Sequence, residues 1–157
     1  MSQSANGPTV TLNPAFLQEI KESNVKLWND FDALRQLCDT PLMPLTAIRQ
    51  LVPVLLQVRD GLSLQFALED SCGYFLGPAD VAHRLASRAA AARAAHGSLY
   101  LLLSELCEQA EDLQYRGPTE PDLAVLLAGA QEFALRLLEH EQEEAALIAL
   151  AYDDQLR

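Results

Sequence analysis

The sequence is poor in positive charge and in long apolar runs. Its 157 residues hold 11 lysines and arginines against 22 aspartates and glutamates, which gives a net charge of -11. Such a chain repels nucleic-acid phosphates and anionic lipid surfaces, so we expect neither nucleic acid nor a membrane as a partner. No apolar stretch reaches the roughly 18 to 20 residues needed to span a bilayer, and the opening Met1–Pro8 lacks a signal-peptide pattern. The sequence predicts a soluble cytoplasmic protein.

Motifs of common enzymes are lacking as well. The three cysteines have no CxxC spacing, and their odd number argues against both a disulfide framework and a structural zinc site. A Ser-His-Asp order and a glycine-rich phosphate loop are absent, so nucleophilic catalysis and nucleotide binding have no support. We therefore expect a protein that is not an enzyme.

What the chain does have is apolar residues at helical spacing. Half of its residues are hydrophobic, mostly leucine and alanine, a composition that favours helix over strand. Steps of three and four residues between apolar positions predict four helices. We expect the first from Pro14, directly after the N-cap candidate Asn13, to Cys38, and the second from Pro44 to Phe75. We expect the third from Ala82 to just before Gly117-Pro118, and the fourth from about Thr119 to Ala151.

The short connections between these helices predict the topology. Neighbouring helices joined by short loops run antiparallel, so the expected fold is all-α, an up-down-up-down antiparallel four-helix bundle. Residues 13–157 would form the bundle, and residues 1–12 a flexible N-terminal segment.

Polar residues interrupt the apolar stripes of all four helices. Burying such groups costs free energy unless they pair with one another or with an ion. At about 1.5 Å per residue, their depths along the helices agree within roughly 10 Å, so they can share one layer. The interrupting residues are Asn24, Gln65, Glu69, His96, Tyr100, His140 and Glu144.

Several of these residues form pairs four residues apart, which places both side chains on one helical face. Histidines and carboxylates at this spacing on facing helices are how helical bundles build metal sites. The pairs are Gln65/Glu69, His96/Tyr100 and His140/Glu144.

Three stretches of the sequence resemble the hemerythrin-like family of four-helix bundles. Residues 65–70, Gln-Phe-Ala-Leu-Glu-Asp, resemble the family's His-Phe-x-x-Glu-Glu motif. Residues 95–99, Ala-His-Gly-Ser-Leu, resemble its third-helix histidine, and residues 138–144, Leu-Glu-His-Glu-Gln-Glu-Glu, its fourth-helix His-x-x-x-Glu motif. The resemblance extends from about Leu17 to Ala151.

The resemblance implies a di-iron site that is degenerate in this chain. In the family, five histidines and two bridging carboxylates hold two irons. Here Asn24 and Gln65 stand where two of the histidines would be, and Tyr100 takes a third histidine position. The ligand positions that remain are Glu69, His96, His140 and Glu144. Amides are poor iron ligands, so a reversible dioxygen carrier is not expected.

Three states of the site remain open. His96 and His140 can hold one iron, zinc or manganese ion, with Glu69, Glu144 and Tyr100 as further ligands. In a second state the same groups form a closed hydrogen-bond network without metal. An intact dimetal site is the third.

The network alternative gives the amides a role. Asn24 and Gln65 would then donate hydrogen bonds to the buried carboxylates. Glu139, Glu141 and Glu143, which flank the fourth-helix motif, are expected to form a solvated acidic face.

The function favoured by these observations is a non-enzymatic binding or sensing module. A mononuclear metal-binding protein is the first alternative. A structural interaction protein, dimeric through an exposed helix face, is the second, and its protein partner cannot be named from the sequence.

Overall fold

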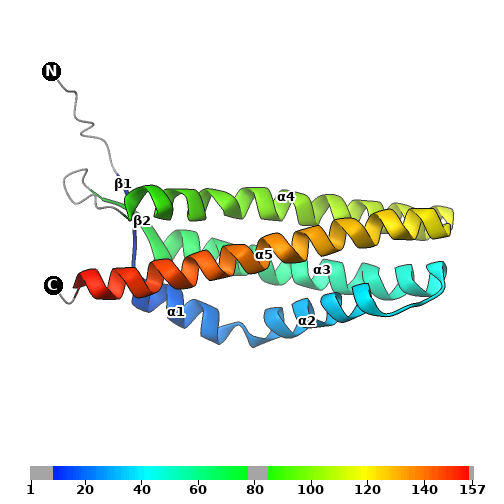
Figure 1. Ribbon diagram of the computed structural model, residues 1–157, viewed down its shortest axis with the longest axis horizontal. Helices are drawn as coiled ribbons and strands as arrows, with labels where there is room; N and C mark the ends of the chain where they lie inside the picture. Colours follow the sequence, from blue (N-terminus) through cyan, green and yellow to red (C-terminus); the bar gives the residue numbers. More distant parts are fainter. Residues whose placement is uncertain (1–8, 78–84, 156–157) are drawn as a thin grey trace, which may run out of the picture. The chain divides into compact units, whose positions relative to one another are not determined.

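The computed structural model describes residues 9–77 and 85–155, which are almost entirely helical (Figure 1). The all-α class predicted from the sequence is confirmed, apart from one small antiparallel sheet of two strands. In chain order the elements are β1 (Thr9–Leu12), α1 (Pro14–Ser23), α2 (Val25–Asp39), α3 (Pro44–Leu68), the π-helix η1 (Glu69–Gly73), β2 (Tyr74–Gly77), α4 (Ala86–Arg116) and α5 (Glu120–Gln155).

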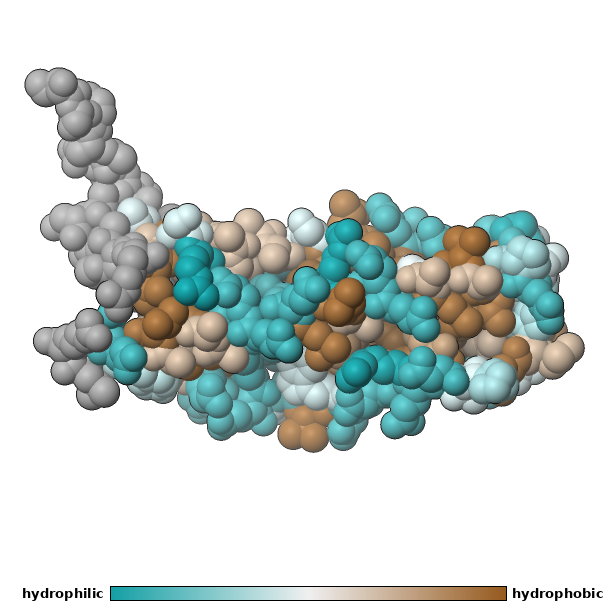
Figure 2. Space-filling model, viewed as in Figure 1, coloured by the Kyte–Doolittle hydropathy of each residue, from teal (hydrophilic) through white to brown (hydrophobic). Residues whose placement is uncertain are grey.

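The chain divides into two compact units. Unit 1 comprises Met1–Ser23, Gln65–His96 and Glu139–Arg157, and unit 2 comprises Asn24–Leu64 and Gly97–Leu138. Helices α3, α4 and α5 each contribute residues to both units. On the face displayed in Figure 2, hydrophobic residues occur in separate groups between hydrophilic ones.

The core of each unit follows from the apolar stripes of its helices. In unit 1, buried residues of α1, α4 and α5 pack around Tyr74 of β2, among them Leu17, Ala89 and Leu147. In unit 2, rings of Phe31 and Phe133 meet edge to face with centroids 6.4 Å apart. The surrounding core of unit 2 is aliphatic and includes Leu27, Leu34, Ile48, Leu51, Leu55, Val58, Leu62, Leu103, Leu106, Leu126 and Leu137.

Helix termini are capped as the sequence predicts. The side chain of Asn13 accepts a hydrogen bond from the Phe16 amide at 3.1 Å, at the start of α1. Helix α4 stops before Gly117, whose φ of 85° is in the left-handed region that glycine tolerates. Thr119 and Asp122 exchange backbone and side-chain hydrogen bonds of 3.1 and 3.3 Å at the start of α5.

The first predicted helix is two helices, so the prediction of one helix from Pro14 to Cys38 is wrong. Asn24 interrupts it with φ -104° and ψ 57°. The Ser23 hydroxyl donates a hydrogen bond of 3.1 Å to the Ile20 carbonyl and so satisfies a backbone acceptor in the last turn of α1. Serine and asparagine side chains compete with helical backbone bonds, which explains why the break falls here.

The second predicted helix also ends early. Instead of continuing to Phe75, α3 ends at Leu68 and gives way to η1, which closes with a hydrogen bond from the Tyr74 amide to the Glu69 carbonyl. That bond spans five residues, the mark of a π-turn. Aromatic Tyr74 and Phe75 then continue as strand, a conformation that suits aromatic side chains.

The second strand pairs with residues 9–12, the last four residues of the segment that the sequence predicts to be flexible. Thr9 pairs with Gly77 and Leu12 with Tyr74 in the antiparallel register. Val10 and Leu12 pack against the unit 1 core, and this apolar contact orders the strand. Residues 1–8 of the predicted flexible segment lie outside the described residues.

Glycine at position 73 allows the turn from η1 into β2 to pack against α1. A Cβ placed there would lie 2.3 Å from Cδ2 of the fully buried Leu17. We expect Gly73→Ala to lower the free energy of unfolding by about 2 kcal/mol, because the methyl group would overpack the core. Gly97→Ala is the control: nothing lies within 4 Å of its Cβ position in α4, and we expect a gain of about 0.5 to 1 kcal/mol. Urea denaturation would measure both, and equal effects would contradict the packing explanation.

One helical stretch is more apolar than the sequence analysis allowed. Residues Pro44–Gly73 are long and apolar enough to cross a membrane by length and composition, since a window of 18 residues within them has a mean hydropathy of 1.2. The statement that no such stretch exists is therefore wrong by this measure. Buried side chains such as Leu51, Leu55 and Leu62 account for part of its apolar character.

Candidate functional site

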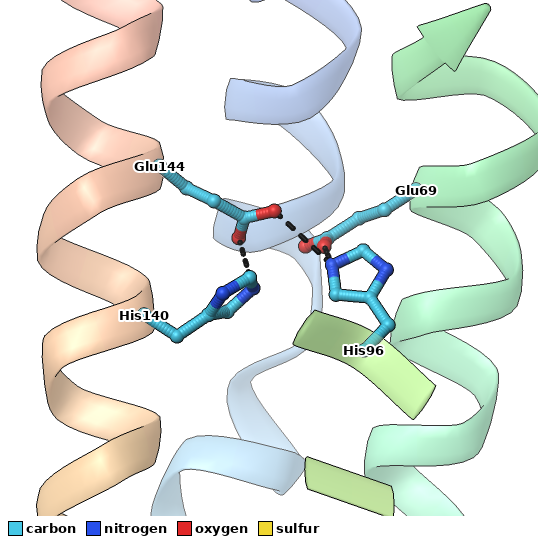
Figure 3. A group of neighbouring side chains, drawn as sticks. All are labelled: Glu69, His96, His140 and Glu144. Carbon is cyan, nitrogen blue, oxygen red and sulfur yellow. Dashed lines mark hydrogen bonds and ion pairs between the residues drawn. The ribbon is translucent and has the colours of Figure 1, made fainter. Parts of the chain in front are cut away.

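Four of the predicted site residues meet inside unit 1. Glu69 comes from η1, His96 from α4, and His140 and Glu144 from α5. All four are buried, with exposed fractions of 0, 3, 7 and 0 %. One nitrogen or oxygen from each lies within 4.8 Å of the others. Figure 3 shows their side chains converging, with Glu144 between the two histidines.

The two residues from α5 reach this point because they are four residues apart on one helical face. His140 Nε2 lies 3.2 Å from Glu144 Oε1. Glu69 is held from the other side by Gln65, one turn earlier, whose amide nitrogen donates to Glu69 Oε2 at 2.7 Å. The i, i+4 pairs read from the sequence are thus confirmed for Gln65/Glu69 and for His140/Glu144.

His96 is held between carboxylates on both ring nitrogens. Nδ1 lies 2.8 Å from Asp70 Oδ1, while Nε2 lies 3.0 Å from Glu69 Oε1 and 3.2 Å from Glu144 Oε2. The ring stacks on Phe66, with centroids 4.0 Å apart and planes within 8°. Burial lowers the pKa of His96, but the hydrogen bonds and charges of Glu144 and Glu69 outweigh it and raise the pKa to about 9.

A lysine completes the cluster. The Lys21 ammonium, from α1, donates hydrogen bonds of 3.2 Å to Glu69, 2.9 Å to Glu141 and 2.5 Å to Glu144. Burial lowers the pKa of this ammonium, but the three carboxylates together raise it above its ordinary value. Lys21 therefore remains positively charged at neutral pH.

Glu144 is the centre of the cluster. Besides the two histidines and Lys21, it accepts a hydrogen bond of 2.6 Å from the Tyr74 hydroxyl. Burial alone would raise the pKa of the Glu144 carboxyl, but its contacts with both histidines and Lys21 hold the pKa well below its usual value. Burial and the neighbouring Glu144 charge raise the pKa of Tyr74, so its hydroxyl keeps the proton that it donates. Glu144 is thus a carboxylate at all physiological pH values.

Two buried atoms of the four residues make no hydrogen bond of good geometry, although each lies close to an oppositely charged group, at 3.0 Å from His96 Nε2 and 3.2 Å from Glu144 Oε1. They are Glu69 Oε1 and His140 Nε2. Buried polar atoms are nearly always hydrogen-bonded, so such a pair of atoms suggests a missing bonding partner. A divalent metal ion would satisfy both.

The donor set fits such an ion. Two imidazoles and two carboxylates are ligands used by zinc, iron and manganese. Around a tetrahedral zinc ion, ligand atoms at about 2.1 Å from the metal lie about 3.4 Å from one another. The four ligand atoms of this site lie within 4.8 Å of one another, so side-chain shifts of about 1 Å would bring them to that spacing. The Asp70 carboxylate on His96 Nδ1 is the partner that orients a metal-binding histidine in many sites, leaving Nε2 for the ion.

Comparisons with protein-family models, curated proteins and solved structures find no match. The resemblance to the hemerythrin-like family stays a prediction. The function has to be inferred from the site itself.

The other predicted positions are divided between the two units: Gln65 belongs to unit 1, and Tyr100 and Asn24 to unit 2. Tyr100 belongs to unit 2 and is 39 % exposed, and its role as a further ligand stays a prediction. Asn24 also belongs to unit 2, where it precedes α2 and is half-buried. Gln65 is fully buried and donates to Glu69, the role that the network alternative gave it.

The sequence analysis missed two residues of the cluster and misplaced a third. Lys21 lies four residues after Leu17, on the apolar stripe, and that position was the available signal. Tyr74 was not predicted as a site residue, because the second helix was expected to extend through it to Phe75. Glu141 is not part of a solvated face, since its carboxylate contacts Lys21 and its side chain is only 20 % exposed.

Proposed function

We propose that this protein is a non-enzymatic binding module that holds one divalent transition-metal ion. The ion, iron, zinc or manganese, would bind Glu69, His96, His140 and Glu144. The observation that carries this proposal is the buried group of four potential ligands, in which Glu69 Oε1 and His140 Nε2 make no hydrogen bond of good geometry. When bound, the ion would supply a structural cross-link between η1, α4 and α5.

The ligand set also argues for the absence of dioxygen transport. Four protein ligands leave a small ion few open positions, and a single ion cannot share two electrons with dioxygen as a pair of irons does. The protein is therefore proposed as a module that binds or senses a metal and has lost the chemistry of the family it resembles.

The proposal includes the hemerythrin-like, up-down-up-down four-helix bundle as the topology of residues 13–157. The order of the helices and the positions of His96, His140 and Glu69 support it. We also propose a cytoplasmic location, without nucleic-acid or membrane partners, because the net charge is -11. A homodimer through an exposed helix face remains an alternative.

Metal content tests the proposal directly. Protein purified without a histidine tag should contain about one iron, zinc or manganese ion per chain by elemental analysis. His140→Ala should lose the ion, because it removes one of the two imidazoles in the group of four potential ligands. Excess zinc should raise the melting temperature of the wild type and leave that of His140→Ala unchanged, by ligand linkage.

The matched control for His140→Ala is Glu139→Ala, because Glu139 is an exposed neighbour of His140 on the same helix. Glu139→Ala should bind metal like the wild type. Wild-type protein that binds no iron, zinc or manganese after removal and re-addition of metal would overturn the proposal, and two irons per chain would overturn its mononuclear part.

A metal-free module is the second candidate, and one observation favours it. The buried carboxylates of Glu69 and Glu144 already face two positive groups, Lys21 and protonated His96. Buried charges that balance one another need no ion. In that case EDTA would leave the melting temperature unchanged, whereas the metal-binding module would melt at a lower temperature in EDTA.

A further inference from the structure

The two lysines of this chain lie in contrasting surroundings. Lys26 is 74 % exposed and pairs with Asp30, one turn further along α2. The Lys21 side chain is only 14 % exposed, and three carboxylates surround its ammonium. Burying a lysine is costly unless its charge is compensated, and here the compensation exceeds one negative charge. Lys21 therefore has a different role from an ordinary surface lysine.

The two fully buried carboxylates each contact groups at two positions, and Glu144 Oε1 faces both, because it also lies 3.2 Å from His140 Nε2. Glu69 Oε1 and Glu144 Oε2 lie 3.0 and 3.2 Å from His96 Nε2, on the side of the histidines. Glu69 Oε2 and Glu144 Oε1 lie 3.2 and 2.5 Å from Lys21 Nζ. The carboxylates thus bridge two neighbouring cation positions. The histidines provide donors at the first, and the Lys21 ammonium occupies the second.

Glu141 belongs to the second position only. Its Oε1 lies 2.9 Å from Lys21 Nζ, and it is not among the four residues that can share an ion at the first position. Oxygen atoms from three carboxylates are a ligand set suited to a hard divalent cation such as Mn²⁺ or Mg²⁺, and also to Zn²⁺. The second position has the ligands of a cation site, with the ammonium in the place of the cation.

We propose that Lys21 is a built-in cation that closes this second position and limits the protein to one divalent ion. The limit to one ion rests on the proposed function of the first position, but the closing of the second position does not. A neutral side chain at residue 21 would open a second divalent-cation site between Glu69, Glu141 and Glu144. Lys21 thereby determines how many ions the protein binds.

The test compares three proteins: the wild type, Lys21→Leu and the control Lys26→Leu. Leucine removes the ammonium, leaves room for an ion and offers no ligand atom. After EDTA treatment, each protein is titrated with Mn²⁺ and Zn²⁺ by calorimetry, and its metal content is measured after gel filtration. Lys21→Leu should bind about one ion per chain more than the wild type and Lys26→Leu, because removing a nearby positive charge strengthens binding of a divalent cation by at least about tenfold.

Two further variants identify the ligands. Adding Glu141→Gln to Lys21→Leu should weaken the additional ion by at least about tenfold, because it removes one of three carboxylates. Lys21→Arg, which keeps the charge, should bind no additional ion. Lys21→Leu that binds the same number of ions as Lys26→Leu would overturn the proposal.

The outcomes separate this proposal from the proposed function. If the wild type binds one ion and Lys21→Leu also binds one, the proposed function stands and the role of Lys21 is wrong. If the wild type binds none and Lys21→Leu binds one, the proposed function fails and the role of Lys21 stands.

Loss of the ammonium can also prevent folding. Lys21→Leu that folds with Mn²⁺ or Zn²⁺ but not in EDTA would support the proposal, because the ion then replaces the missing charge. If this variant does not fold in either condition, the test is made on the wild type, by comparing the rates at which acetic anhydride acetylates Lys21 and Lys26. The proposal expects Lys21 to react at least about tenfold more slowly than Lys26, since its ammonium is buried and charged. Equal reaction rates would overturn it.

Discussion

Glu144→Gln is expected to lower the free energy of unfolding of the metal-free protein by about 3 to 5 kcal/mol. The carboxylate is fully buried and contacts Lys21, Tyr74 and both histidines of the cluster. Neutralising it leaves the ammonium of Lys21 and the charged ring of His96 with less compensation in a buried place. Urea denaturation in EDTA would measure the loss, which corresponds to roughly 10 °C in melting temperature for a chain of this size.

Glu143→Gln is the matched control. Glu143 neighbours Glu144 in sequence, but its partner is Arg88 and both side chains are substantially exposed, at 39 and 44 %. Surface ion pairs contribute about 1 kcal/mol or less, so this variant should unfold nearly like the wild type. Equal losses in the two variants would show that the buried contacts of Glu144 do not stabilise the fold.

The stability of the metal-free protein should fall as the pH rises from about 6.5 to about 9. The pKa of His96 is raised from 6.5 to about 9 in the folded protein. Its charged form therefore stabilises the fold fully below pH 6.5, and that contribution is lost as the proton leaves between the two values. The gap corresponds to about 3 kcal/mol, at about 1.4 kcal/mol per pKa unit.

His96→Gln separates this contribution from those of other groups. The variant should show little pH dependence between pH 6.5 and 9, whereas His140→Gln should keep most of the wild-type slope. Urea denaturation in EDTA at four or five pH values measures the slope, and an NMR titration of the histidine ring protons reports the pKa of His96 directly. A ring that titrates near pH 6.5 would contradict the proposed ion-pair cluster.

The sequence predicts those parts of the site that depend on helical spacing alone. His140 and Glu144 are four residues apart in a long uninterrupted helix, so their shared face follows from the helical repeat. Glu69 and His96 interrupt apolar stripes, and a buried polar residue needs a partner. Their convergence could therefore be inferred before any coordinates.

The residues that depend on breaks in regular structure could not be found in this way. The backbone of Asn24 is not helical, and this break separates α1 from α2. The spacing of apolar residues continues across Asn24 and therefore does not predict the break. Tyr74 reaches Glu144 only because the helix gives way to a strand. Lysine is normally an exposed residue, so the sequence alone does not predict the burial of Lys21 among three carboxylates.

The π-turn of η1 also sets the angular relation between Glu69 and Tyr74. The hydrogen bond from the Tyr74 amide to the Glu69 carbonyl encloses one residue more than an α-helical turn. In a regular α-helix, residues 69 and 74 would lie about 140° apart around the axis, since each residue turns about 100°. A regular α-helix of the same length would therefore turn the Tyr74 side chain away from the side of Glu69. Substitutions that extend α3 as a regular helix through residue 73 should accordingly remove the hydrogen bond from Tyr74 to Glu144.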